Sequence, residues 1–501
     1  MDSFTSSVNS QVIYLDGYDT ANSVKTIALG YWYKNDTPSS SSNEFMPPKI
    51  LDSAFYRALQ EFPILAGHIK TDSSSRMYVD IDKNNLNMPV YTDTACDLSY
   101  SDMEKAGFNI KKLPIDLYGT YGVPVPTKLS GGKIKPASFH ILRFKNNTGV
   151  LVYASIGNCI TDGYGFVHFM NLWAEVARWM QQPQDDKREP LAIPEFIYDR
   201  KFTAAMRSDE TFHQNIVDVK GLSAESTASR WLAWMSPERR GLLIKKWYEP
   251  TDYTCCFFHI PSETIEALRL RLRKAGATNE HSTINNIITA YLAIVIAQAK
   301  KKANDDWWFN RPFLAVFRSL FDRSIDEKAA FKVTTSINMR PRVPSIEAID
   351  YMGNLGYATS VSFLNNDLQK KDLDTMLLYS LVCGFDQNAS DYHARYYAKI
   401  GYLMEKSPSN YLYNLALGSK NANGFQASNH SRFAHYEVDF GSGAPELVRH
   451  APHAYNDIAF IMPSNPKTGG YEVELKLAPD VAVHVRQNSM WMEPVDKYRC
   501  I

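Results

Sequence analysis

The chain has 501 residues and a mass of 56.9 kDa, so its length predicts two or more hydrophobic cores rather than one. Hydrophobic residues make up 45% of it and charged residues 22%, which is typical of folded globular proteins. The 54 basic residues balance the 54 acidic ones, which argues against a broad basic surface for nucleic acid. A small charged ligand is not excluded, because a local patch can hide within a balanced total.

Cysteine content and hydropathy favour a cytoplasmic protein. Six cysteines without a CxxC pair argue against a disulfide scaffold or a thiolate zinc site, and they fit a reducing compartment. Residues 1–30 show no basic start followed by an apolar run, so we expect no signal peptide. The most apolar stretch, 284–299, is interrupted by polar residues and is too short to span a bilayer. We therefore expect no membrane span and no metal site.

The first recognisable elements are a helix and a hairpin. Apolar residues recur at helical spacing over 51–62, and Pro63 then ends the predicted helix. Two β-rich runs, 138–145 and 149–156, are separated by a short Asn-Asn-Thr segment, which predicts a β-hairpin.

A second helix follows the hairpin, and the composition then changes. Apolar residues form one stripe of a helix that begins near Asp162 or Gly163. Residues 181–200 are polar and contain three prolines, which is typical of a linker. Residues 205–248 are charged, and we expect an insert there with some helical character.

Strand and helix patterns resume beyond the insert. Residues 253–260 predict a strand, and 262–275 predict an amphipathic helix. A buried helix is expected over 283–299, with Ser282 and Thr283 as candidate caps. Because strands and helices alternate on both sides of the linker, two α/β domains are the simplest arrangement.

Two short segments are candidates for a functional site. NCITDGYG (158–165) lies where the second hairpin strand meets the next helix, a position that exposes side chains and helix N–H groups. In isolation, Asp162 is most simply a helix cap and Gly163 a residue that eases the turn. DFGSG (439–443) has the composition of a tight polar loop. Neither segment alone specifies a reaction.

Together, in this order and separation, the segments resemble the BAHD family of acyl-CoA-dependent acyltransferases along nearly the whole chain. That family carries HxxxDG near residue 160 and DFGWG in the last quarter, where this chain has NxxxDG and DFGSG. Further matching segments are LDSAFYRALQEFPILAGHI (51–69), IPEFIYDR (193–200), HSTINNIITAYL (281–292), INMRPRV (337–343) and YMGN (351–354).

The resemblance implies an α/β fold of two chloramphenicol acetyltransferase-like domains, each a mixed sheet with flanking helices. We expect an N-terminal domain over 1–190, a crossover linker and insert over 191–250, and a C-terminal domain over 251–501. The active-site channel would lie at the interface. Acyl-CoA would be a co-substrate, with no tightly bound cofactor, and a hydroxyl or amine of a small secondary metabolite would be the acceptor. We expect a monomer.

The resemblance also assigns roles to individual residues. The family's Asp pairs with an Arg and orients the turn, and its DFGWG loop is structural and distant from the chemistry. The positions that match are Asp162, Gly163, Arg340, Asp439, Phe440, Gly441 and Gly443. Ser442 stands where the family has Trp, which predicts a repacked loop without catalytic meaning.

Asn158 occupies the position of the family's general-base histidine. A carboxamide does not take up a proton near neutral pH, and loss of a positioned base lowers rates by about 10²–10⁴-fold. Three explanations stay open. The base was replaced by engineering, the chain is a natural acyltransferase with a weakened or relocated base, or the fold now binds a ligand or guides another reaction such as a cyclisation.

Other side chains are candidates for a substitute base. His430 stands where plant relatives often carry Trp, although an ordinary, partly exposed loop histidine is the simpler interpretation. His140 is expected on a sheet face. His168 falls off the apolar stripe of its helix, so we expect it to face solvent. Cys159 has no neighbouring base or cation in sequence that would lower its pKa.

Overall fold

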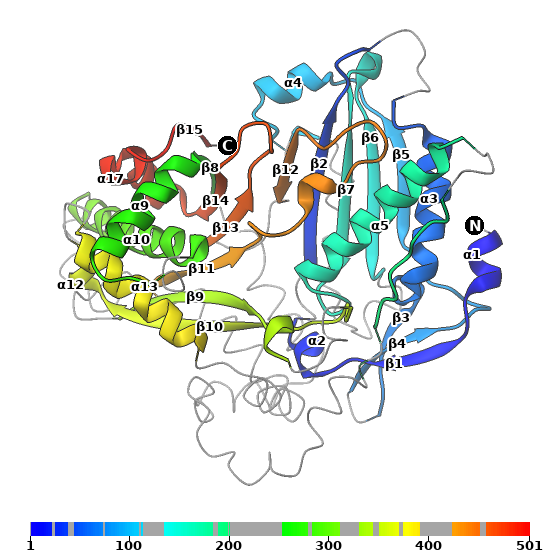
Figure 1. Cartoon of the computed structure of the whole chain (residues 1–501), viewed down its shortest axis with the longest axis horizontal. Helices are drawn as coiled ribbons and strands as arrows, with labels where there is room; N and C mark the ends of the chain where they lie inside the picture. The colour runs from blue at the N-terminus through cyan, green and yellow to red at the C-terminus, as the bar shows by residue number, and fades with distance from the viewer. Residues whose placement is uncertain are drawn as a thin grey trace.

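The computed structural model describes the chain in segments that together cover both halves of the molecule. These segments are residues 2–22, 26–38, 45–73, 76–109, 112–113, 135–183, 189–198, 200, 253–278, 283–310, 330–343, 350–369, 374–390, 423–450 and 457–500. The predicted insert, 205–248, lies outside the described residues. Figure 1 shows two sheet-based halves side by side, with a small third sheet beneath the N-terminal one.

The N-terminal half is built on a five-stranded mixed sheet. Its strand order is β12 (Leu447–His450), β2 (Thr26–Lys34), β7 (Gly149–Gly157), β6 (Ala137–Arg143) and β5 (Val90–Ala95). The predicted hairpin is confirmed, because β6 and β7 pair antiparallel with Ile141 opposite Val152. The turn between them places Asn146 and Asn147 at φ of 57° and 55°, a left-handed conformation that asparagine tolerates well.

Helices cover both faces of this sheet. Helices α3 (Pro48–Glu61) and α5 (Gly163–Gln181) pack on one face, and both were predicted from their apolar spacing. Because neighbouring strand residues point to opposite faces, Tyr31 and Tyr33 join the core on the helix side. Trp32 joins a second cluster with Tyr100 of α4 (Tyr100–Lys105) on the other face.

The C-terminal half contains a seven-stranded mixed sheet. Its strand order is β10 (Gly356–Leu364), β9 (Ala330–Asn338), β11 (Gly424–Asn429), β13 (Ile458–Pro463), β14 (Tyr471–Leu477), β8 (Thr254–Ile260) and β15 (Lys497–Cys500). The helices of this half are α9 (Ser262–Lys274), α10 (Ile284–Phe309), α12 (Asn365–Leu368), α13 (Thr375–Ser390), α16 (Pro479–Gln487) and α17 (Ser489–Met492). The expected strand over 253–260 and the helix that follows it are confirmed.

Helix α10 crosses the centre of the C-terminal core. The Thr283 hydroxyl accepts a hydrogen bond from the Asn286 N–H (3.1 Å), as expected of a cap, whereas Ser282 lies outside the described residues. The helix continues past its predicted end at 299 to Phe309. The additional turns are rich in lysine and aspartate, and Lys301 and Asp305 pair across one turn (2.9 Å).

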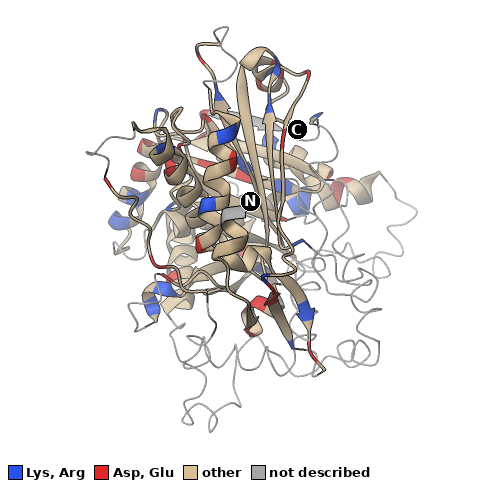
Figure 2. Ribbon diagram, turned by 90° about the vertical axis from the view of Figure 1, so that its right-hand side faces the viewer, with Lys and Arg blue, Asp and Glu red and all other residues tan. Residues whose placement is uncertain are grey.

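The remaining described elements complete the N-terminal half. Strands β1 (Gln11–Tyr14), β4 (Met77–Ile81) and β3 (His68–Thr71) form an antiparallel sheet, and α1 (Asp2–Ser7) and α2 (Gly17–Ala21) flank β1 along the chain. No described helix has both the length and the apolar character that crossing a bilayer requires. Figure 2 shows basic and acidic residues interspersed over the described surface in view.

One cysteine forms a disulfide bond, which the sparse cysteine content did not predict. Cys256 on β8 is disulfide-bonded, and the residue opposite it in the register is Cys500 of β15. One bridge does not make a disulfide scaffold, and among the described residues Cys96, Cys159 and Cys383 carry free thiols.

The C-terminal part of the chain contributes a strand to the N-terminal sheet. Strand β12 pairs with β2 and forms the edge of the N-terminal sheet, although it lies within 251–501. Tyr436, Val438 and Phe440 are also part of the N-terminal core. The expected division at 190 and 251 stays a prediction, and the structure adds that residues 436–450 pack on the N-terminal sheet.

Candidate active site

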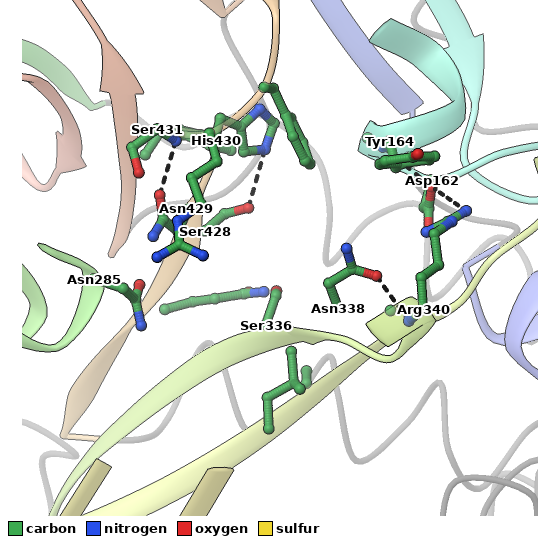
Figure 3. Close-up of a pocket in the computed structure, with 18 of the residues that line it drawn as sticks. Asp162, Tyr164, Asn285, Ser336, Asn338, Arg340, Ser428, Asn429, His430 and Ser431 are labelled. Carbon is green, nitrogen blue, oxygen red and sulfur yellow. Dashed lines mark hydrogen bonds and ion pairs between the residues drawn. The ribbon is translucent and has the colours of Figure 1, made fainter. Parts of the chain in front are cut away.

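A cavity of about 530 Å³ lies between the two large sheets. Its wall comes from the turn after β7, the start of α10, and the ends of β9, β11, β12 and β13. Most of the residues that line it are of polar types (Figure 3), and the most frequent are side-chain amides: Asn22, Asn158, Asn285, Asn286, Asn338, Asn354, Gln426 and Asn429. Such a surface can form many hydrogen bonds with a polar ligand and carries little net charge.

Asp162 caps α5 and forms a bidentate ion pair with Arg340. Its Oδ1 atom accepts hydrogen bonds from the N–H groups of Tyr164 (3.1 Å) and Gly165 (3.2 Å). Arg340 donates from Nη1 to Oδ2 (2.7 Å) and from Nη2 to Oδ1 (3.1 Å). The Leu355 N–H donates to Oδ2 at 3.1 Å. The carboxylate therefore joins the N-terminus of α5 to two segments of the C-terminal half.

Arg340 is buried and uses its remaining donors on backbone carbonyls. Its guanidinium donates to the carbonyl oxygens of Tyr351 (2.8 Å) and Gly353 (2.9 Å), and it lies over the Tyr164 ring, 4.2 Å from the centroid. Because the group is planar and has five donors in a fixed arrangement, it fixes the geometry of several segments at once. Asp162 and Arg340 thus brace the turn instead of presenting free charges to the cavity (Figure 3).

A second buried network lies behind the turn. Arg200 pairs with Asp19 (2.8 Å) and donates to the Ile160 carbonyl (2.6 Å). The Asn354 amide donates to Asp19 (2.8 Å) and to the Asn158 carbonyl (2.7 Å). No local sequence pattern predicts a role for Asp19, because its partners lie more than a hundred residues away along the chain.

Asn158 lies in the cavity wall at the end of β7. Within the described part of the chain, its side-chain Oδ1 is buried and has no hydrogen-bond partner. The adjacent Cys159 is fully buried, and burial raises the pKa of its thiol to about 12. A thiol with so high a pKa stays protonated near neutral pH, so Cys159 is a poor nucleophile.

His430 lines the same cavity and is 7% exposed, so the expectation of a partly exposed loop histidine was wrong. Its Nε2 lies 3.2 Å from the Ser428 hydroxyl. A Cβ atom added to Gly163 would lie 3.6 Å from the Cε1 atom of His430, so the imidazole packs directly against the turn. Burial lowers the pKa of His430 to about 4.

Two further histidines adjoin His430. His435, within a short 3₁₀ turn (His435–Glu437), places its Nε2 3.4 Å from Nδ1 of His430. The ring of His450, on β12, is centred 5.0 Å from that of His430. Burial depresses the pKa of both of these imidazoles well below its usual range. Neither histidine was predicted from the sequence, although both lie close to the DFGSG segment, one on either side of it.

The other histidines considered from sequence occupy different environments. His140 is buried on β6 beside the Thr92 hydroxyl (2.8 Å) and is not part of the cavity wall. His168 does not face open solvent as expected, because it packs on Tyr164 with ring centroids 4.2 Å apart. Burial lowers the pKa of both imidazoles. Neither lies in the cavity.

The DFGSG loop lies at the far end of α5 from Asp162. Asp439 accepts hydrogen bonds from the N–H groups of Gly441 and Gly443, both at 2.8 Å, and these glycines have φ of +96° and +95°. Arg178 and Gln181 donate hydrogen bonds to the loop's carbonyls, and they follow Asp162 by about four to five turns, or ~24–28 Å. The Ser442 hydroxyl accepts a hydrogen bond from the Met46 N–H (3.3 Å).

Comparison with known proteins agrees with this arrangement. Residues 6–490 match the profile of the Transferase family, whose members are BAHD-type acyltransferases. The chain belongs to this family. The match covers nearly the whole length, including both halves of the chain, and it confirms the resemblance.

Solved structures show the same fold at low sequence identity. TRI101 of F. graminearum superposes with a TM-score of 0.65 at 13% identity, covering 98% of this chain and 100% of that one. TRI101 of F. sporotrichioides, complexed with coenzyme A and T-2, gives 0.63 at 14% identity and the same coverage. Vinorine synthase gives 0.56 at 16% identity over 95% of each chain. The expected fold of two chloramphenicol acetyltransferase-like halves is confirmed.

Proposed function

We propose that this protein transfers an acyl group from acyl-CoA to a hydroxyl or amine of a small molecule bound in the interdomain cavity. The observation that carries the proposal is the braced Asn158–Asp162 turn in the cavity wall of a BAHD-type fold. The solved structures of TRI101 with coenzyme A and T-2 support it, since a related fold holds a thioester carrier and a small acceptor. The acceptor here is expected to be a polar secondary metabolite.

The proposed role of Asn158 is to orient the acceptor. Its buried Oδ1 can accept a hydrogen bond from the attacking O–H or N–H group. The carboxamide does not take the proton away, so Asn158 alone supplies alignment without general-base catalysis. Asp162 and Arg340 hold the turn in place, and Gly163 allows His430 and Phe433 to approach it closely.

Two exposed cations in the cavity wall suit the donor. Arg342 and Arg432 line the cavity and are exposed. Phosphate groups of coenzyme A would meet favourable charge there, although the whole chain is neutral.

The direct test compares the native chain with Asn158→His. Both proteins are incubated with a panel of acyl-CoA esters and small alcohols or amines, and free thiol and acylated product are measured. We expect measurable transfer by the native chain and faster transfer by Asn158→His, by up to about 10²–10⁴-fold, because imidazole restores a positioned base. If neither protein binds acyl-CoA or releases thiol with any acceptor, the proposal is wrong.

A second candidate function follows from Asn158 itself. A fold that has lost its base could bind a small molecule or guide a cyclisation without a donor. In that case a small polar ligand would raise the melting temperature, whereas acyl-CoA would not, because only a ligand bound by the native state stabilises it.

A further inference from the structure

A line of hydrogen-bonding groups runs from the cavity into the N-terminal core. The Ser428 hydroxyl and Nε2 of His430 are 3.2 Å apart, and both residues line the cavity. Nδ1 of His430 lies 3.4 Å from Nε2 of His435. Nδ1 of His435 lies 3.1 Å from the Tyr31 hydroxyl on β2. Each histidine thus has a polar partner at both ring nitrogens.

The geometry of this line is tightly constrained. The His430 and His435 rings are stacked at an interplanar angle of 10°, and both His435 and Tyr31 are fully buried. Polar rings in such a place destabilise the fold unless their nitrogens are hydrogen-bonded, and an apolar side chain would pack there without that requirement. Packing alone therefore does not explain why this line ends at the cavity.

We propose that His430 is the general base of the acyl transfer, and that His435 and Tyr31 are positioning residues that fix its tautomer. This inference rests on the proposed function. Its basis is the location of His430, which lines the cavity that contains Asn158 and packs against Gly163 of the same turn. Asn158, at the family's base position, would then orient the acceptor. The base would instead be His430, on a different segment of the cavity wall.

In this step one proton moves from the acceptor to coenzyme A by way of His430. With its own proton on Nδ1, His430 donates to Nε2 of His435, whose Nδ1–H in turn donates to the Tyr31 oxygen. Nε2 of His430 is then unprotonated, and its electron pair accepts a hydrogen bond from the Ser428 hydroxyl until the acceptor's O–H group takes that place. The acceptor's O–H proton moves to Nε2 as its oxygen attacks the thioester carbonyl carbon. The C–S bond breaks, and the departing coenzyme A thiolate takes the same proton back as a thiol.

Nearby charges support this role. The carboxylates of Asp162 and Glu474 both favour the protonated form of His430, although burial is the larger influence and lowers its pKa to about 4. The imidazole is consequently neutral and able to accept a proton throughout the physiological range. His450, which lines the cavity, donates its backbone N–H to the Glu474 carboxylate (3.2 Å). An imidazole with so low a pKa is almost entirely in the unprotonated form that acts as a base. It is a weak base, however, and this limits the rate of proton transfer.

The decisive experiment places His430→Gln in two backgrounds. In the native chain we expect His430→Gln to lower kcat by about 10²–10⁴-fold with unchanged affinity for acyl-CoA. In the Asn158→His background, where a second base is available, the same change should lower kcat less than about tenfold. His140→Gln is the matched control, since His140 is equally buried but outside the cavity, and it should leave kcat unchanged.

Each alternative result has one meaning. An equal loss in both backgrounds would assign His430 a structural role, and no loss in the native chain would remove it from catalysis. If the native chain is inactive while Asn158→His is active, the base role of His430 is wrong and the acyltransferase function stands. If neither protein binds acyl-CoA or transfers an acyl group, the proposed function itself fails.

Two further measurements guard against variants that do not fold. His430→Ala leaves room for added imidazole, and recovery of activity with imidazole would support a base at that place, whereas no recovery would count against it. His435→Phe should lower kcat about tenfold with no change in KM for acyl-CoA. His435→Gln should keep most of the kcat of the unaltered chain, because the amide oxygen can accept a hydrogen bond from the Nδ1–H of His430. Equal kcat values for the two His435 variants would contradict the positioning role.

Discussion

Asn158 and His430 line one cavity with different chemical capacities. Asparagine is similar in size to histidine and keeps one hydrogen-bond acceptor available, so the wall keeps its shape while its chemistry changes. His430 can exchange a proton, and the cavity holds it beside the turn that carries Asn158. At the scale of single residues, the roles that we propose therefore divide alignment and proton transfer between two side chains.

Gly165 provides a test of packing at the same turn. A Cβ atom there would lie 2.1 Å from the Thr161 hydroxyl and 2.8 Å from the Met352 carbonyl oxygen. Gly165→Ala should therefore lower the free energy of unfolding by about 1–3 kcal/mol, as measured by urea denaturation. Gly356→Ala is the control, because its nearest contact would be 3.9 Å away at the Ile337 carbonyl. Equal effects of the two changes would contradict this account.

The ion pair at the start of α5 makes a prediction at the scale of elements. Arg340→Met would leave Asp162 partly buried without its cation, and we expect a loss of about 3–5 kcal/mol in chemical denaturation. Arg342→Met is the matched control, since Arg342 is exposed and neighbouring, and should change stability by less than about 0.5 kcal/mol. A small effect of Arg340→Met would show that the pair does not brace the turn.

Local patterns in the sequence predicted elements better than they predicted the site. Helices α3 and α5 and the β6–β7 hairpin were accessible because period and turn composition are properties of adjacent residues. The Asp162–Arg340 pair came from the family resemblance. The Asp19–Arg200 pair and the His430–His435–Tyr31 line were not predicted, because their partners meet through tertiary folding. His430 was singled out, but its burial depends on β12, which no local pattern assigned to the N-terminal sheet.

The buried histidines predict how the whole molecule responds to acid. Burial lowers the pKa of His430 to about 4, from 6.5 in the unfolded chain, and it depresses the pKa values of His435 and His450 well below their usual range. The unfolded state therefore binds more protons below about pH 6.5, so stability is complete above that pH and declines as pH falls toward 4. For His430 alone, the free energy of unfolding falls by about 3 kcal/mol over this pH range.

Urea denaturation at about pH 7.5 and about pH 5 would measure this decline. The charged and titratable groups around the cluster are Asp162, Glu474, Lys476, Arg449 and Tyr31, and the two carboxylates act against the effect of burial on His430. Replacing His435 by Gln should make stability less dependent on pH, because one buried titrating group is removed. An unchanged slope would contradict the prediction.

The pairing of β12 with β2 has a consequence during translation, because a strand that is made late completes a sheet whose other strands are made early. Strand β2 emerges from the ribosome early, yet its edge partner is encoded at 447–450, and the carbonyl that accepts the Tyr33 hydroxyl belongs to Val438. The N-terminal sheet therefore keeps an unpaired edge until about nine-tenths of the chain has been translated, a period of tens of seconds at typical elongation rates. During that time the edge is open to pairing with other chains.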